Sequence, residues 1–251
     1  MPIDFLSETE HRPWSLPAAP WVMAQRWHDL LFAHWPVKVD ALRDLIPAQL
    51  EIDTFDGEAW IGIVPFRMSG IRPRFLPAVR GLSNFLELNV RTYVKVNGKP
   101  GVWFFSLDAA NPIAVEIARA TFQLPYYRAR MSMTEVEGGF HYRSQRTHRD
   151  APPSAYDVCY GSNGPVYQSS PGSLEHWLTE RYCLYTIKKN RVYCGDIHHR
   201  PWPLQAGWLE SKIDTLAIDH KIDLPDTAPV LHFTSGVDVV VWPIYEVKKK
   251  G

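Results

Sequence analysis

The sequence predicts a mostly β protein of the α+β class, in which a mainly antiparallel sheet curls into a barrel or a sandwich. Three observations support this. About ten segments are typical of short strands, and most are joined in pairs by turn residues. Only two or three short segments have the pattern of a helix. The 10 tryptophans and 21 prolines among 251 residues exceed ordinary usage and indicate short strands around an aromatic-rich interior.

The first part of the chain is expected to contain extended segments and one short helix. A proline-rich arm covers residues 1–20. The helix is expected over Val39–Ile46, because Pro47 stops a helix at this point. The extended segments of this part, in chain order, are Met23–His34, Leu50–Asp53 and Ala59–Met68.

The strongest local turn signal is Asn97-Gly98, which predicts a hairpin between strands at Phe85–Val96 and Val102–Leu107. A helix is expected next, over Pro112–Thr121. Asn111 suits the N-cap of this helix, and proline suits its first position.

The second half of the chain is also predicted to form hairpins, together with one more helix. That helix is expected over Leu174–Glu180, with Ser173 as its N-cap. The expected hairpins are Tyr126–Val136 with Phe140–Arg146, Tyr182–Ile187 with Val192–Ile197, and Val230–Thr234 with Val237–Tyr245, the last turning at Ser235-Gly236.

Composition narrows the class of protein and its partners. The 27 basic and 27 acidic residues balance, which argues against nucleic acid or an anionic membrane as the main partner. The three cysteines are too few for a disulfide framework, and we find neither a signal peptide nor an apolar stretch of membrane-spanning length. We therefore expect a cytoplasmic protein.

No linker or repeat interrupts the chain, so we expect one domain over 1–251, with the arm at 1–20, the barrel at 21–247 and a basic tail at 248–251. Homo-oligomerisation is left open.

The most informative strand is Phe85–Val94. Because side chains alternate between the two faces of a strand, Glu87, Asn89, Arg91 and Tyr93 share one face and the leucines and valines share the other. The polar face either meets solvent or lines a cavity inside the barrel. Alternation alone favours solvent.

Standard catalytic and cofactor motifs are absent from the sequence, so no metal and no cofactor is expected. His198 and His199 are adjacent on an expected strand and point to opposite faces, which disfavours a shared ion. The cysteines are expected to be packed thiols. Lys188-Lys189 lies in a hairpin turn, where lysines are normally solvated.

Five segments of the chain carry a resemblance to a known family: Leu31–Val37, Phe85–Arg91, Leu124–Met131, Glu180–Tyr185 and His198–Leu204. They resemble the YqjF-like family of uncharacterised proteins, which is related to the acetoacetate-decarboxylase-like superfamily. The resemblance extends from about Trp21 to Tyr245. It implies a curved antiparallel β-barrel that encloses a pocket, and it favours the cavity over solvent for the Glu87 face.

The resemblance does not extend to the Schiff-base chemistry of the superfamily. Acetoacetate decarboxylases carry a lysine pair, one member of which forms a Schiff base. This sequence has the matching context, Ala118-Arg119 and then Leu124-Pro125, but Tyr126 and Tyr127 stand where the lysines would be. A phenol cannot form an imine, so no Schiff-base decarboxylase activity is expected. The family's glutamate is matched by Glu87.

Three hypotheses follow, and whether the chain is an enzyme is left open. The favoured one is a pocket protein that binds a small organic molecule, anionic or carbonyl-bearing. The second is a lyase, isomerase or hydrolase acting on a keto-acid-like substrate, with Glu87, Tyr126 or Tyr127 as acid or base. The third is a protein-interaction module with a vestigial pocket. The candidate ligand-binding residues are Glu87, Asn89, Arg91, Tyr126, Tyr127, Arg128 and Arg130.

Overall fold

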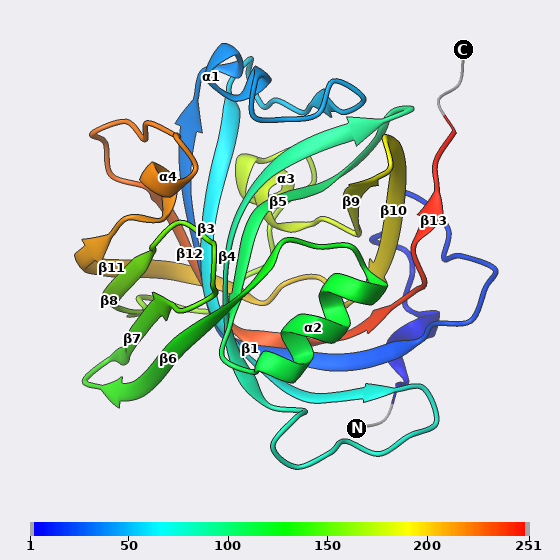
Figure 1. The fold of residues 1–251 in the computed structure, drawn as a ribbon, viewed down its shortest axis with the longest axis horizontal. Helices are drawn as coiled ribbons and strands as arrows, with labels where there is room; N and C mark the ends of the chain where they lie inside the picture. The colour runs from blue at the N-terminus through cyan, green and yellow to red at the C-terminus, as the bar shows by residue number, and fades with distance from the viewer. Residues whose placement is uncertain (1–2, 249–251) are drawn as a thin grey trace.

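The computed structural model describes residues 3–248, and the end of the expected basic tail, 249–251, lies outside them. Thirteen strands of the described chain form one sheet (Figure 1). The strands are β1 (Met23–Val37), β2 (Glu51–Ile52), β3 (Ala59–Pro73), β4 (Phe85–Val96), β5 (Lys99–Ala109), β6 (Tyr126–Val136), β7 (Gly139–Arg146), β8 (Ala155–Ser162), β9 (Cys183–Lys188), β10 (Arg191–His198), β11 (Leu204–Asp214), β12 (Val230–Val241) and β13 (Tyr245–Glu246).

The helices are short, and α2 crosses in front of the sheet in the view of Figure 1. Those of the described residues are a 3-10 turn η1 (Phe5–Ser7), α1 (Val39–Arg43), α2 (Pro112–Thr121), α3 (Leu174–Thr179) and α4 (Leu216–Asp219). The boundaries of α2 match the prediction, and the Asn111 side chain accepts hydrogen bonds from the backbone of Ile113 and Ala114. No helix of residues 3–248 is long and apolar enough to cross a membrane.

The sheet is strongly curved rather than a single closed barrel. Its strand order is β13-β10-β9-β5-β6-β7-β8-β11-β12-β1-β3-β4-β2. Two further pairings, β4 with β5 and β10 with β12, join strands that stand apart in this order, so the sheet folds back on itself. Only β5 with β6 and β5 with β9 are parallel among the pairings of the described chain. The predicted mostly antiparallel β fold is therefore confirmed.

The C-terminal hairpin predicted at Ser235-Gly236 is wrong, because β12 runs through this point as one strand. It pairs with β1 on both sides of the glycine, with Leu30 opposite Thr234 and Trp27 opposite Val237. A Cβ on Gly236 would lie 2.0 Å from the Trp27 carbonyl oxygen. The glycine therefore permits a close approach of the β12 and β1 backbones, next to a register shift in the pairing of β1 with β3, and does not make a turn.

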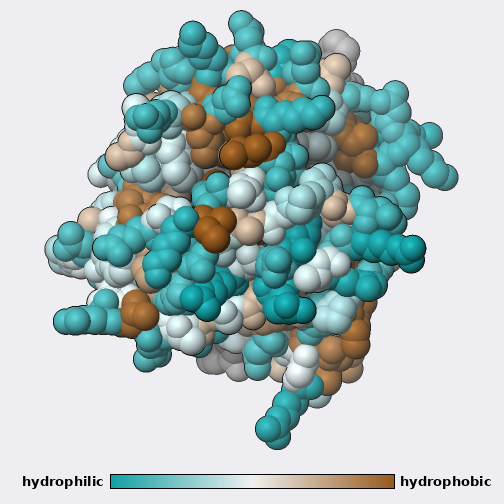
Figure 2. Space-filling view, turned by 60° about the vertical axis from the view of Figure 1, so that its left-hand side comes forward, coloured by the Kyte–Doolittle hydropathy of each residue, from teal (hydrophilic) through white to brown (hydrophobic). Residues whose placement is uncertain are grey.

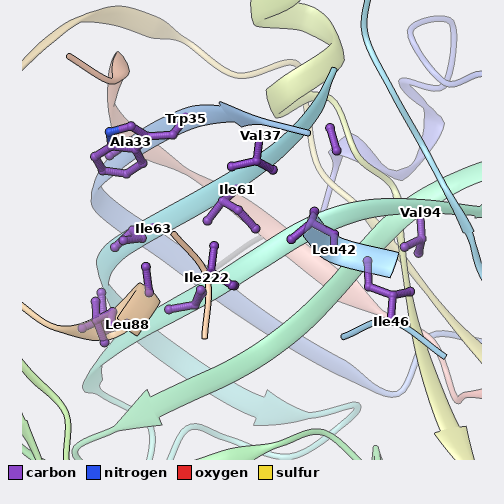
Figure 3. Packing of buried hydrophobic residues seen from close by; sticks show 14 of the residues in the cluster. Ala33, Trp35, Val37, Leu42, Ile46, Ile61, Ile63, Leu88, Val94 and Ile222 are labelled. Carbon is purple, nitrogen blue, oxygen red and sulfur yellow. The ribbon is translucent and has the colours of Figure 1, made fainter. Parts of the chain in front are cut away.

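Strand β4 is buried on both faces, which excludes a solvated polar face. Leu88 and Val94 on one face pack in the main hydrophobic cluster with Ile61 and Ile63 of β3 (Figure 3). Glu87 on the opposite face is only 3% exposed. Because the sheet curls around this strand, its polar residues point into the molecule.

The N-terminal arm packs against the sheet over its described part. Phe5 is buried, and Arg12 donates to the carbonyl of Ile197 at the end of β10. Trp242 donates to the carbonyl of Ala19. The outer surface is mainly hydrophilic in the view of Figure 2, with apolar surface gathered in a few places.

Candidate ligand-binding cavity

A cavity of about 380 Å³ lies between strand β4 and helix α2. Its walls are mostly apolar and come from α2 and from eight strands, β1, β3, β4, β5, β6, β9, β10 and β12. Few polar side chains line it. The charged or titratable ones are Glu87, Arg91, Tyr126, Arg181, Cys183 and His199.

Helix α2 and the loop between β3 and β4 form the outer wall. Ala114, Ala118 and Phe122 line the cavity from the helix side, and Leu82 lines it from the loop. The helix and loop are joined by Asn111, whose amide donates to the carbonyl of Gly81 at 3.0 Å. The N-cap residue of α2 thus also fixes the loop that covers the cavity.

Glu87 is a buried carboxyl group with a phenol as its partner. The Tyr126 hydroxyl donates to Glu87 Oε2 at 2.8 Å, and the Glu87 backbone carbonyl accepts from Tyr142. Burial raises the pKa of Glu87 to about 8, and the negative charge of Asp108 adds to this, against the opposing hydrogen bond from Tyr126. The carboxyl group is therefore mostly neutral at pH 7.

The Tyr126 hydroxyl acts as a hydrogen-bond donor. Burial raises the pKa of the Tyr126 phenol well above its usual value, and the Glu87 carboxylate, once ionised, raises it further. It therefore keeps its proton at neutral pH. The pair of Glu87 and Tyr126 can donate to or accept from a carbonyl or hydroxyl group in the cavity.

Arg91 lines the same cavity without a carboxylate partner among residues 3–248. Its guanidinium lies over the Phe32 ring, 5.1 Å from the centroid, and 5.9 Å from that of Tyr93. Its Nε is buried with no hydrogen-bond partner. Opposite it on β3, a Cβ on Gly62 would lie 3.2 Å from Arg91 Cγ, so the glycine leaves room for the side chain.

A second guanidinium, Arg181, meets Arg91 at the Tyr93 ring. Arg181 lies 4.6 Å from that ring and is neutralised by Asp53, whose Oδ2 accepts from Nη1 at 2.7 Å. Its Nη2 is buried without a partner. Sequence reasoning missed this residue. The only signal was its place in the segment Glu180–Tyr185.

The two adjacent tyrosines have different surroundings, because consecutive strand residues face opposite sides. Only Tyr126 lines the cavity. Tyr127 lies in a separate surface depression, where its ring is in edge contact with His148 and the Arg146 guanidinium is 4.5 Å from its centroid.

Three other candidate residues lie away from the cavity. Arg128 is exposed and pairs with Glu116 at 2.6 Å, and Arg130 is exposed on the stretch of β6 that pairs with β7. Strand β6 pairs with β5 only as far as Arg128 and then leaves it, which carries both arginines away from the cavity. Asn89 is buried outside the cavity lining, next to a register shift between Val90 and Arg91.

Residues 24–238 match the family DUF2071, described as an uncharacterized conserved protein. The chain belongs to this family. It is 44% identical over 230 residues to the uncharacterized protein YqjF of Bacillus subtilis (strain 168), which covers 92% of this chain and 94% of the relative.

Solved structures show the fold of this DUF2071 chain. The enduracididine biosynthesis enzyme MppR, complexed with the condensation product of pyruvate and imidazole 4-carboxaldehyde, aligns with a TM-score of 0.60 at 12% identity, over 91% of this chain and 90% of that one. Acetoacetate decarboxylase from Legionella pneumophila aligns with a TM-score of 0.58 at 14% identity, over 97% and 95%. The fold is therefore acetoacetate-decarboxylase-like, as the resemblance implied.

No lysine of the described part of this DUF2071 chain lines the cavity. Lys188 and Lys189 are exposed in the turn between β9 and β10. Lys189 and Asn190 adopt positive φ angles there, as in a tight hairpin turn. The cavity thus offers no amine for a Schiff base.

A different cluster could hold a metal ion, which the sequence argument did not consider. The ligand atoms of Cys183, Cys194 and Asp196, all buried, lie within 4.8 Å of one another on β9 and β10. Asp196 already accepts from Lys99 Nζ at 2.5 Å, which competes with an ion for the carboxylate. The two histidines considered in the sequence are not part of this cluster.

His198 is the last residue of β10 and His199 follows it outside the strand, and the two rings have different surroundings. His198 stacks on Phe5 of the N-terminal arm, with ring centroids 5.4 Å apart. His199 stacks on Tyr182, with centroids 4.8 Å apart, and lines the cavity. Burial lowers the pKa of both imidazoles, to about 4 for His198.

Proposed function

We propose that the cavity binds a small organic acid, with the ligand's carboxylate at Arg91. The observation that carries this proposal is a guanidinium that lines an apolar cavity and pairs with no described carboxylate. Arg91 is partly buried and its Nε is shielded from water without an acceptor, and an anionic ligand would supply that acceptor. Arg181, with Nη2 unpartnered, adds a second donor beside it.

The pair of Glu87 and Tyr126 supplies the second contact. A neutral carboxyl group beside a phenol does not repel an acidic ligand, and it can form hydrogen bonds with a carbonyl or hydroxyl group. A protein of the same fold, MppR, is described in complex with pyruvate, which supports a carbonyl-bearing acid as the ligand.

Acid–base catalysis on the bound acid is a second candidate function. Glu87 favours it, because a pKa of about 8 lies near the pH at which a general acid or base works well. In a lyase or isomerase reaction, Glu87 would exchange a proton with the carbon next to the ligand's carbonyl. Tyr126 would keep its proton and stabilise the carbonyl oxygen by a hydrogen bond.

Calorimetric titration with a panel of carboxylic acids tests the proposed function. We expect Arg91→Ala to weaken binding at least tenfold, because the ligand loses its charged partner. Arg130→Ala, on the exposed part of β6, is the matched control and should bind as the unchanged protein does. Equal binding by both variants would contradict the proposal. Turnover of a bound keto acid, lost in Glu87→Gln, would identify the second function.

A further inference from the structure

The two polar ends of the cavity lie far apart on one strand. Glu87 and Arg91 are four residues apart on β4, which corresponds to about 13 Å between their backbone positions. Arg91 is held at the Phe32 and Tyr93 rings, and Glu87 is held by Tyr126. A keto acid of three or four carbons is shorter than this backbone separation.

The walls around and between these ends are apolar. They offer hydrogen bonds at few places, so most of a ligand's surface would contact hydrocarbon or aromatic rings. Typical members of this wall are Trp27, Met68, Phe85, Phe104, Phe122 and Leu124.

The volume also exceeds what a very small acid fills. A cavity of about 380 Å³ has room for roughly a dozen water molecules at about 30 Å³ each. Water left against apolar walls is unfavourable, so a ligand that replaces most of it binds more tightly.

The mouth of the cavity is apolar as well. Several side chains line the cavity and are exposed to solvent at the same time, which places the opening between α2 and the loop before β4. Ile113 is 52% exposed and Ile117 is 56% exposed, both on α2, and Val79 is 53% exposed on the loop. An apolar ligand would pass over apolar surface on its way in.

From these four observations we infer that the ligand class is carboxylic acids with a continuous apolar body of roughly eight to ten carbon atoms, the length that the separation of the two ends sets. The inference rests on the proposed function, since it takes Arg91 as the carboxylate site. The acid group lies at Arg91, the body follows the apolar wall beside α2, and the far end, where a carbonyl or hydroxyl group would form hydrogen bonds, reaches Glu87 and Tyr126.

Titration with straight-chain acids from four to twelve carbons tests this inference. Each added methylene is expected to tighten binding about three- to fourfold, the fold-change that corresponds to burying one CH₂ group. The gain should end at roughly ten carbons, where the chain meets Glu87. The primary amide of the best acid should bind at least tenfold more weakly.

A variant that shortens the apolar space sharpens the test. Ala118→Leu adds volume on the cavity side of α2 and should weaken the longest acids at least tenfold, with little change for butyrate. Ala120→Leu is the matched control, because Ala120 is exposed on the same helix and does not line the cavity. It should leave every acid unchanged.

The outcomes separate the inference from the proposed function. If four-carbon acids bind as tightly as ten-carbon acids, the inference is wrong and the proposed function stands. Equal effects of Ala118→Leu on short and long acids would also overturn the inference. If no acid of any length binds, both fail.

Discussion

Two arginines of this protein differ in what neutralises them. Arg146 on β7 and Asp108 on β5 are each 1% exposed, and Arg146 Nε donates to Asp108 Oδ1 at 2.8 Å. Arg91 on β4 lines the cavity and pairs with no carboxylate of the described chain. Of these two arginines, the one away from the cavity therefore has a counter-ion from the fold, and the one that lines the cavity has none among residues 3–248. This difference is the main reason to assign Arg91 to a ligand.

The largest expected effect comes from breaking the Arg146 pair. Arg146→Met leaves Asp108 buried without its partner and should lower the free energy of unfolding by about 3–5 kcal/mol. Arg91→Met, the matched substitution in the cavity, should lower it by no more than about 1 kcal/mol, because no buried charge loses a partner. Urea denaturation measures both. Equal losses would show that Arg91 is structural too.

The next effect is a pH dependence that arises from Glu87. Its folded-state pKa of about 8 lies above its ordinary value of 4.5, so between these pH values the folded chain holds a proton that the unfolded chain has released. The free energy of unfolding of the unchanged protein should therefore fall relative to Glu87→Gln as the pH rises through this window, by up to about 1.4 kcal/mol per pH unit. Urea titrations at pH 5, 6.5 and 8 measure the difference. A difference that does not change with pH would mean that Glu87 is already ionised in the folded chain.

A smaller effect is expected from the phenol beside Glu87. Tyr126→Phe removes a hydrogen bond to a buried carboxyl group and should cost about 1–2 kcal/mol at pH 8. Tyr127→Phe should cost less than about 0.5 kcal/mol, since the Tyr127 ring lies outside the cavity. Thermal unfolding of the two variants is the comparison. A larger loss of stability in Tyr127→Phe than in Tyr126→Phe would contradict this account, because it would show that the stronger hydrogen bond is made by Tyr127, outside the cavity.

The smallest effect concerns the exposed arginines of β6. Arg128→Ala breaks a surface ion pair with Glu116 and should change stability by less than about 0.5 kcal/mol. Binding of acids should not change, in contrast to Arg91→Ala. A loss of acid binding in Arg128→Ala would mean that the binding site includes the outer face of β6.

Local signals in the sequence predicted much of the fold. Asn97-Gly98 correctly predicted the hairpin of β4 and β5, and Asn111 correctly predicted the start of α2. Both residues act on the backbone of their neighbours in the chain, so a local pattern is enough to recognise them. Gly236 was misread as a turn residue. Its role is a close approach to Trp27, more than 200 residues earlier, which no local pattern reveals.

The site could be predicted only in part, for the same reason. Alternation along β4 put Glu87 and Arg91 on one face, and the family resemblance favoured a cavity there. Arg181 could not be found, because its counter-ion Asp53 is 128 residues away in sequence. Alternation also could not decide which of Tyr126 and Tyr127 faces inward, since that depends on how β6 pairs with β5.

A crystal structure with a straight-chain acid of about ten carbons bound tests the central claim most directly. The account predicts a carboxylate oxygen about 2.7–3.2 Å from Arg91 Nε, with the chain beside α2 and its far end near Glu87. A carboxylate bound at the Glu87 end, or an acid bound outside the cavity with Arg91 Nε still unpartnered, would contradict it.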